Sequence, residues 1–421
     1  MKFYKETNFK EEPWLGQVPK DWATLRLKET LTLLRNGLTI TQNKSGHGYP
    51  VTRIETISEE KVNPNKVGYI TGLNEKELAE YRLIEGDILF SHINSLEHIG
   101  KTAIYEGVPK LLIHGMNLLL LRPDKNKVYP KFLLYLLRFY RMRNIFRAIA
   151  KKAVNQASIN QTELARVKIP LPSFDEQQKI ANILYCVDLA IQKVDEAIAR
   201  AERLKKGLMQ QLLTKGIGHK EFKETPIGKI PKTWKVMRLK DVAEQKKEIV
   251  IPTKENPSTP YVGLEHVDSG SIRINRHGKA SDVKSTKFRF YRNDILYGKL
   301  RPYLDKVVLS EIDGLCSTDF IVIKTKKTID PKFLVWIMHS RQFVNYAVST
   351  MKGTNHPRTS WASISKYTIG LPPLFEQQKI AEILSSVDDI LQLKRKRRKK
   401  LVRMKRRLMD LLLTGRVRVS V

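Results

Sequence analysis

Two sets of polar loops carry the side chains of this chain that are best suited to contact nucleic acid. Arg and Lys bind phosphate oxygens, and Arg, Asn, Gln, His and Thr can also make hydrogen bonds to the edges of bases. The loops of the first half are NGLTITQNKSGHG (36–48), SHINSLEH (91–98) and KKAVNQASINQ (151–161), and those of the second half are SIRINRHGK (271–279), GKLRPY (298–303) and KGTNHPRTSW (352–361). The pattern predicts two contact surfaces with different side chains.

Nineteen residues of these loops are the candidates for contact with DNA. Those of the first half are Asn36, Thr39, Lys44, His47, His92, Asn94, Lys151, Lys152, Asn155 and Gln156, and those of the second half are Arg273, Arg276, Lys279, Lys299, Arg301, Tyr303, Asn355, His356 and Arg358. Arg301, Asn355 and Arg358 are favoured, because Arg binds guanine and Asn binds adenine through two hydrogen bonds. For any single residue, a solvated or turn-forming polar group is the alternative.

The charge balance agrees with a polyanionic partner. Lys and Arg number 76 against 43 Asp and Glu, so the 421-residue chain has a formal net charge of +33. This excess favours nucleic acid over an anionic membrane surface. The N-terminal stretch has no apolar signal region, and the most apolar run, at 111–121, is too short to span a bilayer, so a cytoplasmic protein without a membrane partner is expected. Cys186 and Cys316 lack metal-ligand spacing and are expected to be buried.

The sequence predicts no active site and no metal site. SLEHIGKT (95–102) ends like a phosphate-binding loop, but Ser95 stands where the first glycine is required. The nine histidines are scattered without metal-ligand spacing. Catalysis by this chain alone is therefore not expected.

The chain contains an internal repeat that must position both sets of loops. VPKDWATLRLKE (18–29) pairs with IPKTWKVMRLKD (230–241) at an offset of 212 residues, and LPSFDEQQKIANILYCVD (171–188) pairs with LPPLFEQQKIAEILSSVD (371–388) at an offset of 200. The offset then stays constant to LLT at 212–214 and 412–414. Each copy is thus an arm, a globular body and a final segment that accepts no insertion.

The final segments are predicted to be long helices. Apolar residues from Ile180 to Leu212 follow alternating four- and three-residue steps, broken only at Lys205, which is typical of a coiled coil. About 40 residues make a rod of about 60 Å, and one inserted residue would turn the seam by about 100°. In the second copy, Lys394, Arg398 and Lys405 fall on seam positions, and eleven of the fourteen residues of KRKRRKKLVRMKRR (394–407) are basic. This stretch is a solvated face, a surface for phosphates or a docking site for an acidic partner.

The two bodies are predicted to be mixed α/β modules. Short β-type runs lie at 87–93, 118–123, 294–300 and 319–325. Each body closes with an amphipathic helix after its PKF motif; the first would carry Arg138, Arg141, Arg143, Arg147, Lys151 and Lys152, and the second lies around 331–347. The scaffold is shared, whereas the polar surface is not.

These features resemble the DNA-specificity subunit of type I restriction-modification enzymes over essentially the whole chain. The matching motifs are LPSFDEQQKIA, LPPLFEQQKIA, DILYGKLRPYLDKV, GLCSTDF, GTNHPRTSW, LMQQLLTKG and LMDLLLTGRVRV. The resemblance implies an α/β (α+β) fold with an internal pseudo-two-fold repeat, in which two target-recognition domains are joined by two long helices packed as an antiparallel coiled coil. The predicted parts are an arm and recognition domain at 1–172, a central helix at 173–216, a second arm and recognition domain at 217–372, and a C-terminal helix at 373–421.

The resemblance also implies the function and the partners. Each recognition domain would read one half of a split, asymmetric sequence in double-stranded DNA. If both bodies enter the same face of the duplex, geometry places the half-sites about one turn, roughly 10 bp, apart. Two methyltransferase subunits and two restriction (translocase-nuclease) subunits would dock on the helices, and S-adenosylmethionine, ATP and Mg would belong to those partners. The helix residues expected to form the spacer and docking surface are Glu176, Gln177, Gln178, Ile180, Leu184, Glu376, Gln377, Gln378, Ile380 and Leu384. The alternatives are a basic coiled-coil adaptor with non-specific DNA binding and a solitary nuclease.

Overall fold

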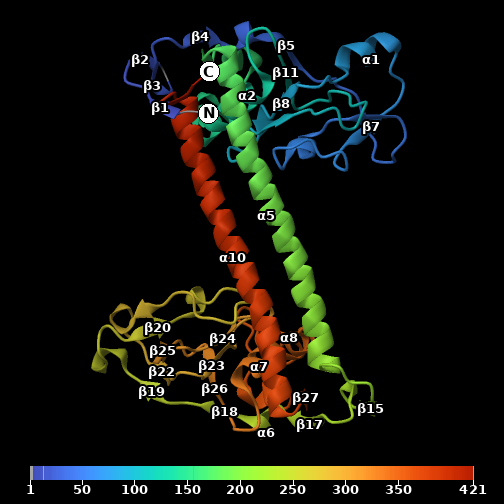
Figure 1. Ribbon diagram of the computed structural model, residues 1–421. Coiled ribbons are helices and arrows are strands. Elements are labelled where there is room, and N and C mark those ends of the chain that lie inside the picture. Colours follow the sequence, from blue (N-terminus) through green and yellow to red (C-terminus); the bar gives the residue numbers. More distant parts are fainter. Residues whose placement is uncertain (1–2, 13, 155, 421) are drawn as a thin grey trace. The chain divides into compact units, whose positions relative to one another are not determined.

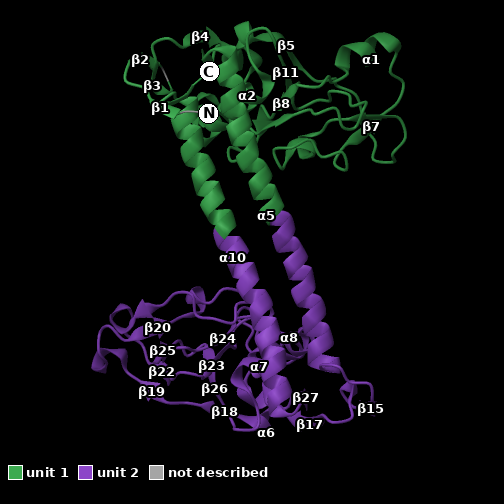
Figure 2. Cartoon of the chain, in the orientation of Figure 1, with its two compact units in different colours: residues 1–194, 397–421 green, residues 195–396 purple. Residues whose placement is uncertain are grey.

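The chain folds into two compact units. The computed structural model describes residues 3–12, 14–154 and 156–420. Unit 1 comprises Met1–Val194 and Arg397–Val421, and unit 2 comprises Asp195–Lys396 (Figure 2). Each unit combines one globular body with parts of the two long helices, α5 (Phe174–Lys215) and α10 (Leu374–Leu413) (Figure 1).

The body of unit 1 is built from short strands and four helices. Its strands are β1 (Phe3–Lys5), β2 (Phe9–Glu12), β3 (Gly16–Pro19), β4 (Ala23–Arg26), β5 (Leu31–Asn36), β6 (Tyr49–Val51), β7 (Gly68–Ile70), β8 (Ile88–Phe90), β9 (Ile93–Asn94), β10 (Thr102–Ile104), β11 (Leu119–Pro123), β12 (Lys151–Lys152), β13 (Ala157–Ser158), β14 (Lys168–Leu171) and β28 (Val417–Val419). Its α-helices, among the described residues and besides α5 and α10, are α1 (Glu75–Tyr81), α2 (Pro130–Met142), α3 (Ile145–Ile149) and α4 (Gln161–Ala165).

The body of unit 2 repeats this plan. Its strands are β15 (Phe222–Thr225), β16 (Gly228–Pro231), β17 (Lys235–Arg238), β18 (Ala243–Lys246), β19 (Ile249–Val250), β20 (Pro260–Val262), β21 (Gly278–Lys279), β22 (Lys287–Phe290), β23 (Ile295–Gly298), β24 (Val307–Leu309), β25 (Gly314–Cys316), β26 (Phe320–Thr325) and β27 (Thr368–Leu371). Its helices are α6 (Leu239–Val242), α7 (Pro331–Met338), α8 (Arg341–Ser349) and α9 (Trp361–Ile364).

The internal repeat extends to the order of strands. A four-stranded sheet in unit 1 runs β5-β11-β8-β10, and one in unit 2 runs β18-β26-β23-β24, with equivalent strands at equivalent places; the five-stranded sheet β19-β22-β25-β20-β21 of unit 2 has no equivalent among the described residues of unit 1. The strand β8 is buried throughout, as expected of a continuous apolar run with both faces covered. The four β-type runs predicted from the sequence are confirmed as β8, β11, β23 and β26.

One hydrophobic core in each unit joins the body to both long helices. In unit 1, Ile180 and Leu184 of α5 share a core with Met409 and Leu412 of α10. In unit 2, Leu212 of α5 shares a core with Ile380 and Leu384 of α10. The helices are antiparallel within each unit, because higher residue numbers on α5 meet lower ones on α10. The first helix predicted over 173–216 and the antiparallel pairing are thereby confirmed.

Within the C-terminal part 373–421, α10 ends at Leu413, just before Gly415, which adopts a left-handed backbone (φ +68), and Val417–Val419 then pair as β28 with β1. Two predictions about local structure were wrong. The closing helix of unit 1 breaks after Met142, where Asn144 is left-handed (φ +60), so Lys151 and Lys152 lie in β12 rather than on a helix. Cys186 is exposed, and only Cys316 is buried as predicted.

Candidate nucleic-acid interface

In unit 2, two loops far apart in the sequence form one polar surface, which we call the unit 2 loop pair (298–303 and 352–361). The backbone N–H of Arg301 donates to the carbonyl oxygen of Pro357 (2.8 Å), and that of Thr359 donates to Lys299 (3.0 Å). Lys352 and Arg358 close the second loop through two backbone hydrogen bonds of 2.9 and 3.0 Å. Six predicted contact residues are thereby brought together: Lys299, Arg301, Tyr303, Asn355, His356 and Arg358.

The two arginines of the unit 2 loop pair differ in whether another residue of the chain holds the guanidinium group. Arg301 has a left-handed backbone (φ +49), and its carbonyl oxygen accepts from the N–H of Leu304 (2.9 Å). Its exposed guanidinium makes no hydrogen bond or ion pair with any residue that the structure describes. The guanidinium of Arg358 is oriented by Asp319, since its Nε donates to Oδ1 at 3.1 Å. Strained backbone at a non-glycine residue is a feature of functional sites.

Unit 1 has an equivalent surface, the unit 1 loop pair (92–94 and 151–158), formed by β9, β13 and β12. Lys152 pairs with Ala157, which in turn pairs with Asn94. This arrangement exposes Lys151, Lys152 and Gln156 and half-exposes Asn94. Asn155 lies outside the described residues. The architecture of the two loop pairs is shared, but the side chains they present differ.

The remaining predicted contact residues of unit 1 lie elsewhere or are buried. Asn36 ends β5, and Thr39, Lys44 and His47 are exposed on a segment held by bridges to Gly115 and Tyr69. His92 is 8% exposed, and burial lowers its pKa to about 4. The prediction that His92 contacts DNA is therefore not supported by its position, because the imidazole faces the interior.

In unit 2, the loop 271–279 makes its own ion pairs. Arg273 binds Asp389 of α10 (2.7 Å), so it attaches the body to the helix. Arg276 binds Asp268 (2.8 Å) and the carbonyl oxygen of Glu265 (2.9 Å). Lys279 is exposed in β21. Because Arg273 and Arg276 are engaged in these contacts, Lys279 is the predicted cation of this loop that is most available to bind DNA.

The helix residues expected to form a docking surface are largely engaged inside the chain. Gln177 and Gln377 have equivalent contacts: each side-chain oxygen accepts from the backbone N–H of the residue just before α2 or α7, that of Tyr129 or Asp330 (both 2.8 Å). The nonpolar members Ile180, Leu184, Ile380 and Leu384 are core residues. Of the predicted set, only Gln178 and Gln378 present substantial polar surface.

The two glutamates of this set receive different partners. Glu176 is 2% exposed and binds Arg418 through two hydrogen bonds of 2.8 Å, which raise the pKa of Arg418 further. Glu376 accepts from Nε2 of His219 (2.8 Å) and Nε1 of Trp234 (3.1 Å). In both units, the segment that follows one long helix is therefore fastened to the start of the other.

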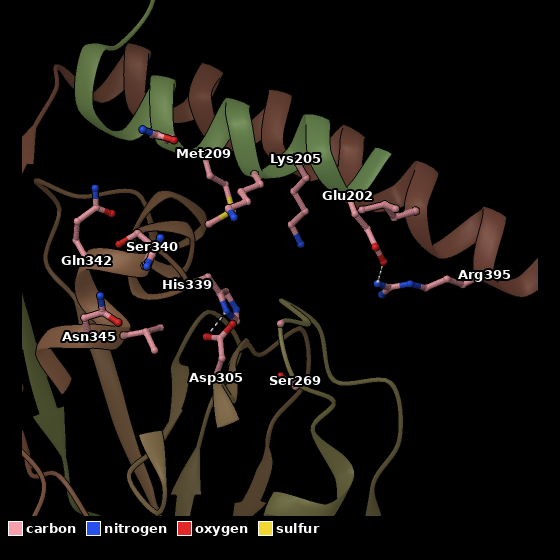
Figure 3. Close-up of a pocket in the computed structure, with 16 residues that line it drawn as sticks. Glu202, Lys205, Met209, Ser269, Asp305, His339, Ser340, Gln342, Asn345 and Arg395 are labelled. Carbon is pink, nitrogen blue, oxygen red and sulfur yellow. Dashed lines mark hydrogen bonds and ion pairs between the residues drawn. The ribbon is translucent and has the colours of Figure 1, made fainter. Parts of the chain in front are cut away.

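A cavity lies where each body meets the helices. In unit 2 it measures about 590 Å³, and α5 contributes Lys205 and Met209 while His339 and Asn345 face them (Figure 3). Nδ1 of His339 is 2.8 Å from Oδ1 of Asp305. The counterpart in unit 1, about 530 Å³, is lined by more cations, including Arg141, Arg147, Lys405 and Arg406. The two junctions share a position and differ in charge.

Among the described residues, no cluster of three or more His, Cys, Asp or Glu side chains could hold a metal ion. No helix in that part of the chain has the length and hydropathy needed to cross a membrane.

Comparison with known families accounts for the repeated architecture. A family profile described as the type I restriction modification DNA specificity domain matches residues 19–202 and again 231–403. The chain belongs to this family. The two matched segments coincide with the two copies of the repeat, so the specificity domain occurs twice in this one chain.

Relatives and solved structures cover the chain almost completely. The type I restriction enzyme MjaX specificity subunit of Methanocaldococcus jannaschii is 42% identical over 439 residues, spanning 100% of this chain and 99% of that protein. The MjaVIII specificity subunit of the same organism is 28% identical and spans 100% and 98%. The type I restriction-modification S subunit of M. genitalium has the same fold (TM-score 0.60, 14% identity), covering 93% of this chain and 96% of that one. A chain from a type I R-M system likewise matches, with a TM-score of 0.52 at 15% identity over 94% and 98%.

Proposed function

We propose that this specificity protein binds a bipartite, asymmetric sequence in double-stranded DNA, with the unit 1 loop pair reading one half-site and the unit 2 loop pair reading the other. The observation that carries the proposal is the pair of equivalent surfaces with unlike side chains. By the sequence offsets of the repeat, Arg301, Asn355 and Arg358 in unit 2 correspond to Asn94, Asn155 and Ser158 in unit 1. Such a difference suits two different half-sites, since bases are distinguished by the pattern of donors and acceptors they meet.

The chain acts as the recognition component and leaves chemistry to its partners. Two methyltransferase subunits and two translocase-nuclease subunits dock on it in the cytoplasm, one of each per repeat. S-adenosylmethionine, ATP and Mg are bound by those subunits. The repeat supports this stoichiometry, because each half offers the same helix ends and the same junction.

The long helices set the unread spacer between the half-sites. A helix of 42 residues is about 60 Å long, which limits the separation to about 18 bp. Inserting four residues into both helices, at 190–200 and 390–400, lengthens the spacer in the recognised sequence and leaves both half-sites unchanged. A changed half-site with an unchanged spacer contradicts this function of the helices.

Mapping methylated adenines in the source genome, with and without this gene, tests the whole proposal. The expected result is one split motif that disappears with the gene. The basic adaptor predicts no lost motif and uniform, steeply salt-dependent binding to any duplex. The solitary nuclease predicts Mg-dependent cleavage by the isolated chain.

A further inference from the structure

The two long helices differ sharply in charge at one place. Residues 394–407 of α10 contain eleven basic and no acidic residues, whereas the equivalent residues 194–207 of α5 contain four basic and three acidic residues. Apart from Lys394, Arg398 and Lys405, which occupy seam positions, the apolar seam residues repeat on both helices at an offset of 200 residues. Packing of the helices therefore does not require the other basic residues of α10.

Most of this charge in unit 1 has no partner within the chain. Lys405 is paired with Asp188 at 2.6 Å, and Arg398 is also engaged. The other cations of this stretch in unit 1 are exposed and make no ion pair or hydrogen bond with the residues described: Arg397, Lys399, Lys400, Arg403, Arg406 and Arg407. Like charges three and four positions apart repel on a helix, so the stretch costs stability until an anion neutralises it.

The basic stretch of unit 1 borders the junction cavity, which also contains arginines of the body. Arg406 lines this cavity of about 530 Å³ together with Arg141 and Arg147. The guanidinium of Arg147 donates to the carbonyl oxygen of Leu96 (3.1 Å), and that of Arg141 donates to Glu97 (3.1 Å). Both arginines are thus fixed on the loop that follows Asn94.

The acidic residues of the cavity cancel only part of this charge, because three carboxylates (Glu60, Glu97 and Asp188) line it against five cations. Glu60 is occupied by Arg141, whose Nη1 lies 2.5 Å from Oε1, and Asp188 is occupied by Lys405. Arg406 is left with an open side toward the cavity. A negatively charged ligand at this position would meet cations from both the body and α10.

We propose that residues 397–407 of α10 and the cavity arginines bind backbone phosphates of the DNA beside the first half-site, on the side of the unread spacer. This inference rests on the proposed function. The spacer side follows from the proposed function, in which the long helices set the spacer, because residues 397–407 belong to one of these helices. Arg and Lys bind phosphates without reading sequence, so this surface supplies affinity and register where no base is read.

The single occurrence of the stretch favours DNA over an acidic protein. A subunit that docks once per repeat needs its surface on both helices, yet the basic stretch is present on α10 alone. A single DNA duplex, by contrast, can be bound through its phosphates at one place in its spacer.

Two matched triple variants test the proposal in the full-length chain. Lys400→Gln, Arg403→Gln and Arg406→Gln remove three cations from α10, and Arg200→Gln, Arg203→Gln and Lys206→Gln remove the three equivalent cations from α5. All six side chains are exposed, and Gln is compatible with a helix. Helical content, measured by circular dichroism, checks that both variants fold.

The readout is the affinity for the target duplex as a function of salt. Each lost phosphate contact lowers the slope of log K against log salt by about 0.9, so between 50 and 200 mM salt the α10 variant should lose about 40-fold less affinity than the wild type. The α5 variant should match the wild type. A target whose spacer carries uncharged methylphosphonates should reproduce the α10 effect, while the preference for the half-site bases stays unchanged.

An α10 variant with the wild-type salt slope overturns the inference, as does an equal effect of the α5 variant. Loss of co-purifying protein subunits with an unchanged salt slope assigns the stretch to an acidic protein instead. An effect of methylphosphonates that is seen only when they flank the whole target, and not when they lie in its spacer, also contradicts the inference. If the wild type shows no sequence preference at all, the proposed function itself fails, which is a separate result.

Discussion

Lys205 of α5 donates to Asp388 of α10 across the helix seam of unit 2, with Nζ 2.7 Å from Oδ1. The same contact recurs in unit 1 between Lys405 and Asp188 at 2.6 Å. An aromatic ring of α7 or α2 covers the lysine. The ring centroid of Trp336 lies 4.8 Å from Nζ of Lys205, and that of Tyr135 lies 5.5 Å from Nζ of Lys405. The lysines that interrupt the apolar seam are thus one half of a repeated ion pair, which fixes the alignment of the helices in each unit.

Removing one partner of the Lys205–Asp388 pair should destabilise unit 2. Asp388 is only 4% exposed, so Lys205→Met leaves a buried carboxylate without its cation, at a cost of about 3 kcal/mol. The double variant Lys205→Met/Asp388→Leu should recover most of this loss. Urea unfolding followed by tryptophan fluorescence measures the cycle. Additive effects of the two single substitutions would contradict a coupled pair.

Arg418 should be the main polar anchor of the C-terminal strand. Besides Glu176, it binds Asp21 (2.9 and 3.0 Å) and Glu6 (2.8 Å). Arg418→Met leaves the buried carboxylate of Glu176 without its cation and should lower the unfolding free energy of unit 1 by about 3 kcal/mol. Arg418→Lys should retain part of the stability, because it keeps the charge but not the planar fork.

The matched control for Arg418 is Arg416, two residues earlier. It pairs with Asp410 at the surface (3.2 Å), with about half of its side chain exposed. Arg416→Met should change the unfolding free energy by less than about 0.5 kcal/mol. Equal changes in unfolding free energy for Arg416→Met and Arg418→Met would contradict the assignment of Arg418 as the main polar anchor.

Unit 1 should lose stability in mild acid. Burial lowers the pKa of His114 to about 4, and Nε2 of this residue lies 3.1 Å from the carbonyl oxygen of Leu118. The positive charges of Arg35 and Arg122 oppose its protonation as well. The native state therefore keeps the ring neutral, whereas the unfolded chain takes up a proton near pH 6.5.

The sign of the pH effect follows from this difference. Stability due to neutral His114 is complete above about pH 6.5 and is lost as the pH falls toward 4, by on the order of 3 kcal/mol. His92, with a pKa also lowered to about 4, adds to the same window. Unfolding measured from pH 7.5 to 4.5 should show a shallower decline in His114→Gln. An identical decline would refute the assignment.

The sequence predicted what depends on periodicity and repetition. Constant spacing of apolar residues located α5, and the offset between the copies predicted the shared scaffold, because both signals are set by burial alone. The seam breaks at Lys205 and Lys405 were visible, and Asp188 and Asp388 repeat at the same offset of 200. Their pairing required knowledge of which helix positions face each other.

Local backbone conformation and long-range contacts were the parts that could not be predicted. The break at Asn144 depends on a left-handed residue within an otherwise helical pattern, and the exit of the C-terminal tail as β28 depends on pairing with a strand more than 400 residues earlier. His92 and Arg273 have side chains typical of DNA contacts, but tertiary packing buries the first and ties the second to Asp389. The polar loops of the sequence were identified, whereas the burial of their members was not.

Arg301 and Lys299, two residues apart in the unit 2 loop pair, should have separable effects on DNA binding. Arg301 has a guanidinium free of internal contacts on a backbone fixed by Pro357 and Leu304, so we expect it to read a base. Arg301→Gln should then cost about 1–3 kcal/mol and relax the preference at one position of the second half-site alone. Lys299→Gln should weaken binding to all sequences equally and lower the salt slope by about 1, as loss of a phosphate contact does. Competition binding against duplexes randomised in one half-site at a time measures both effects, and Lys327→Gln, an exposed lysine outside the loop pair, is the control. A relaxed preference in the first half-site for Arg301→Gln would contradict the assignment of one half-site to each unit.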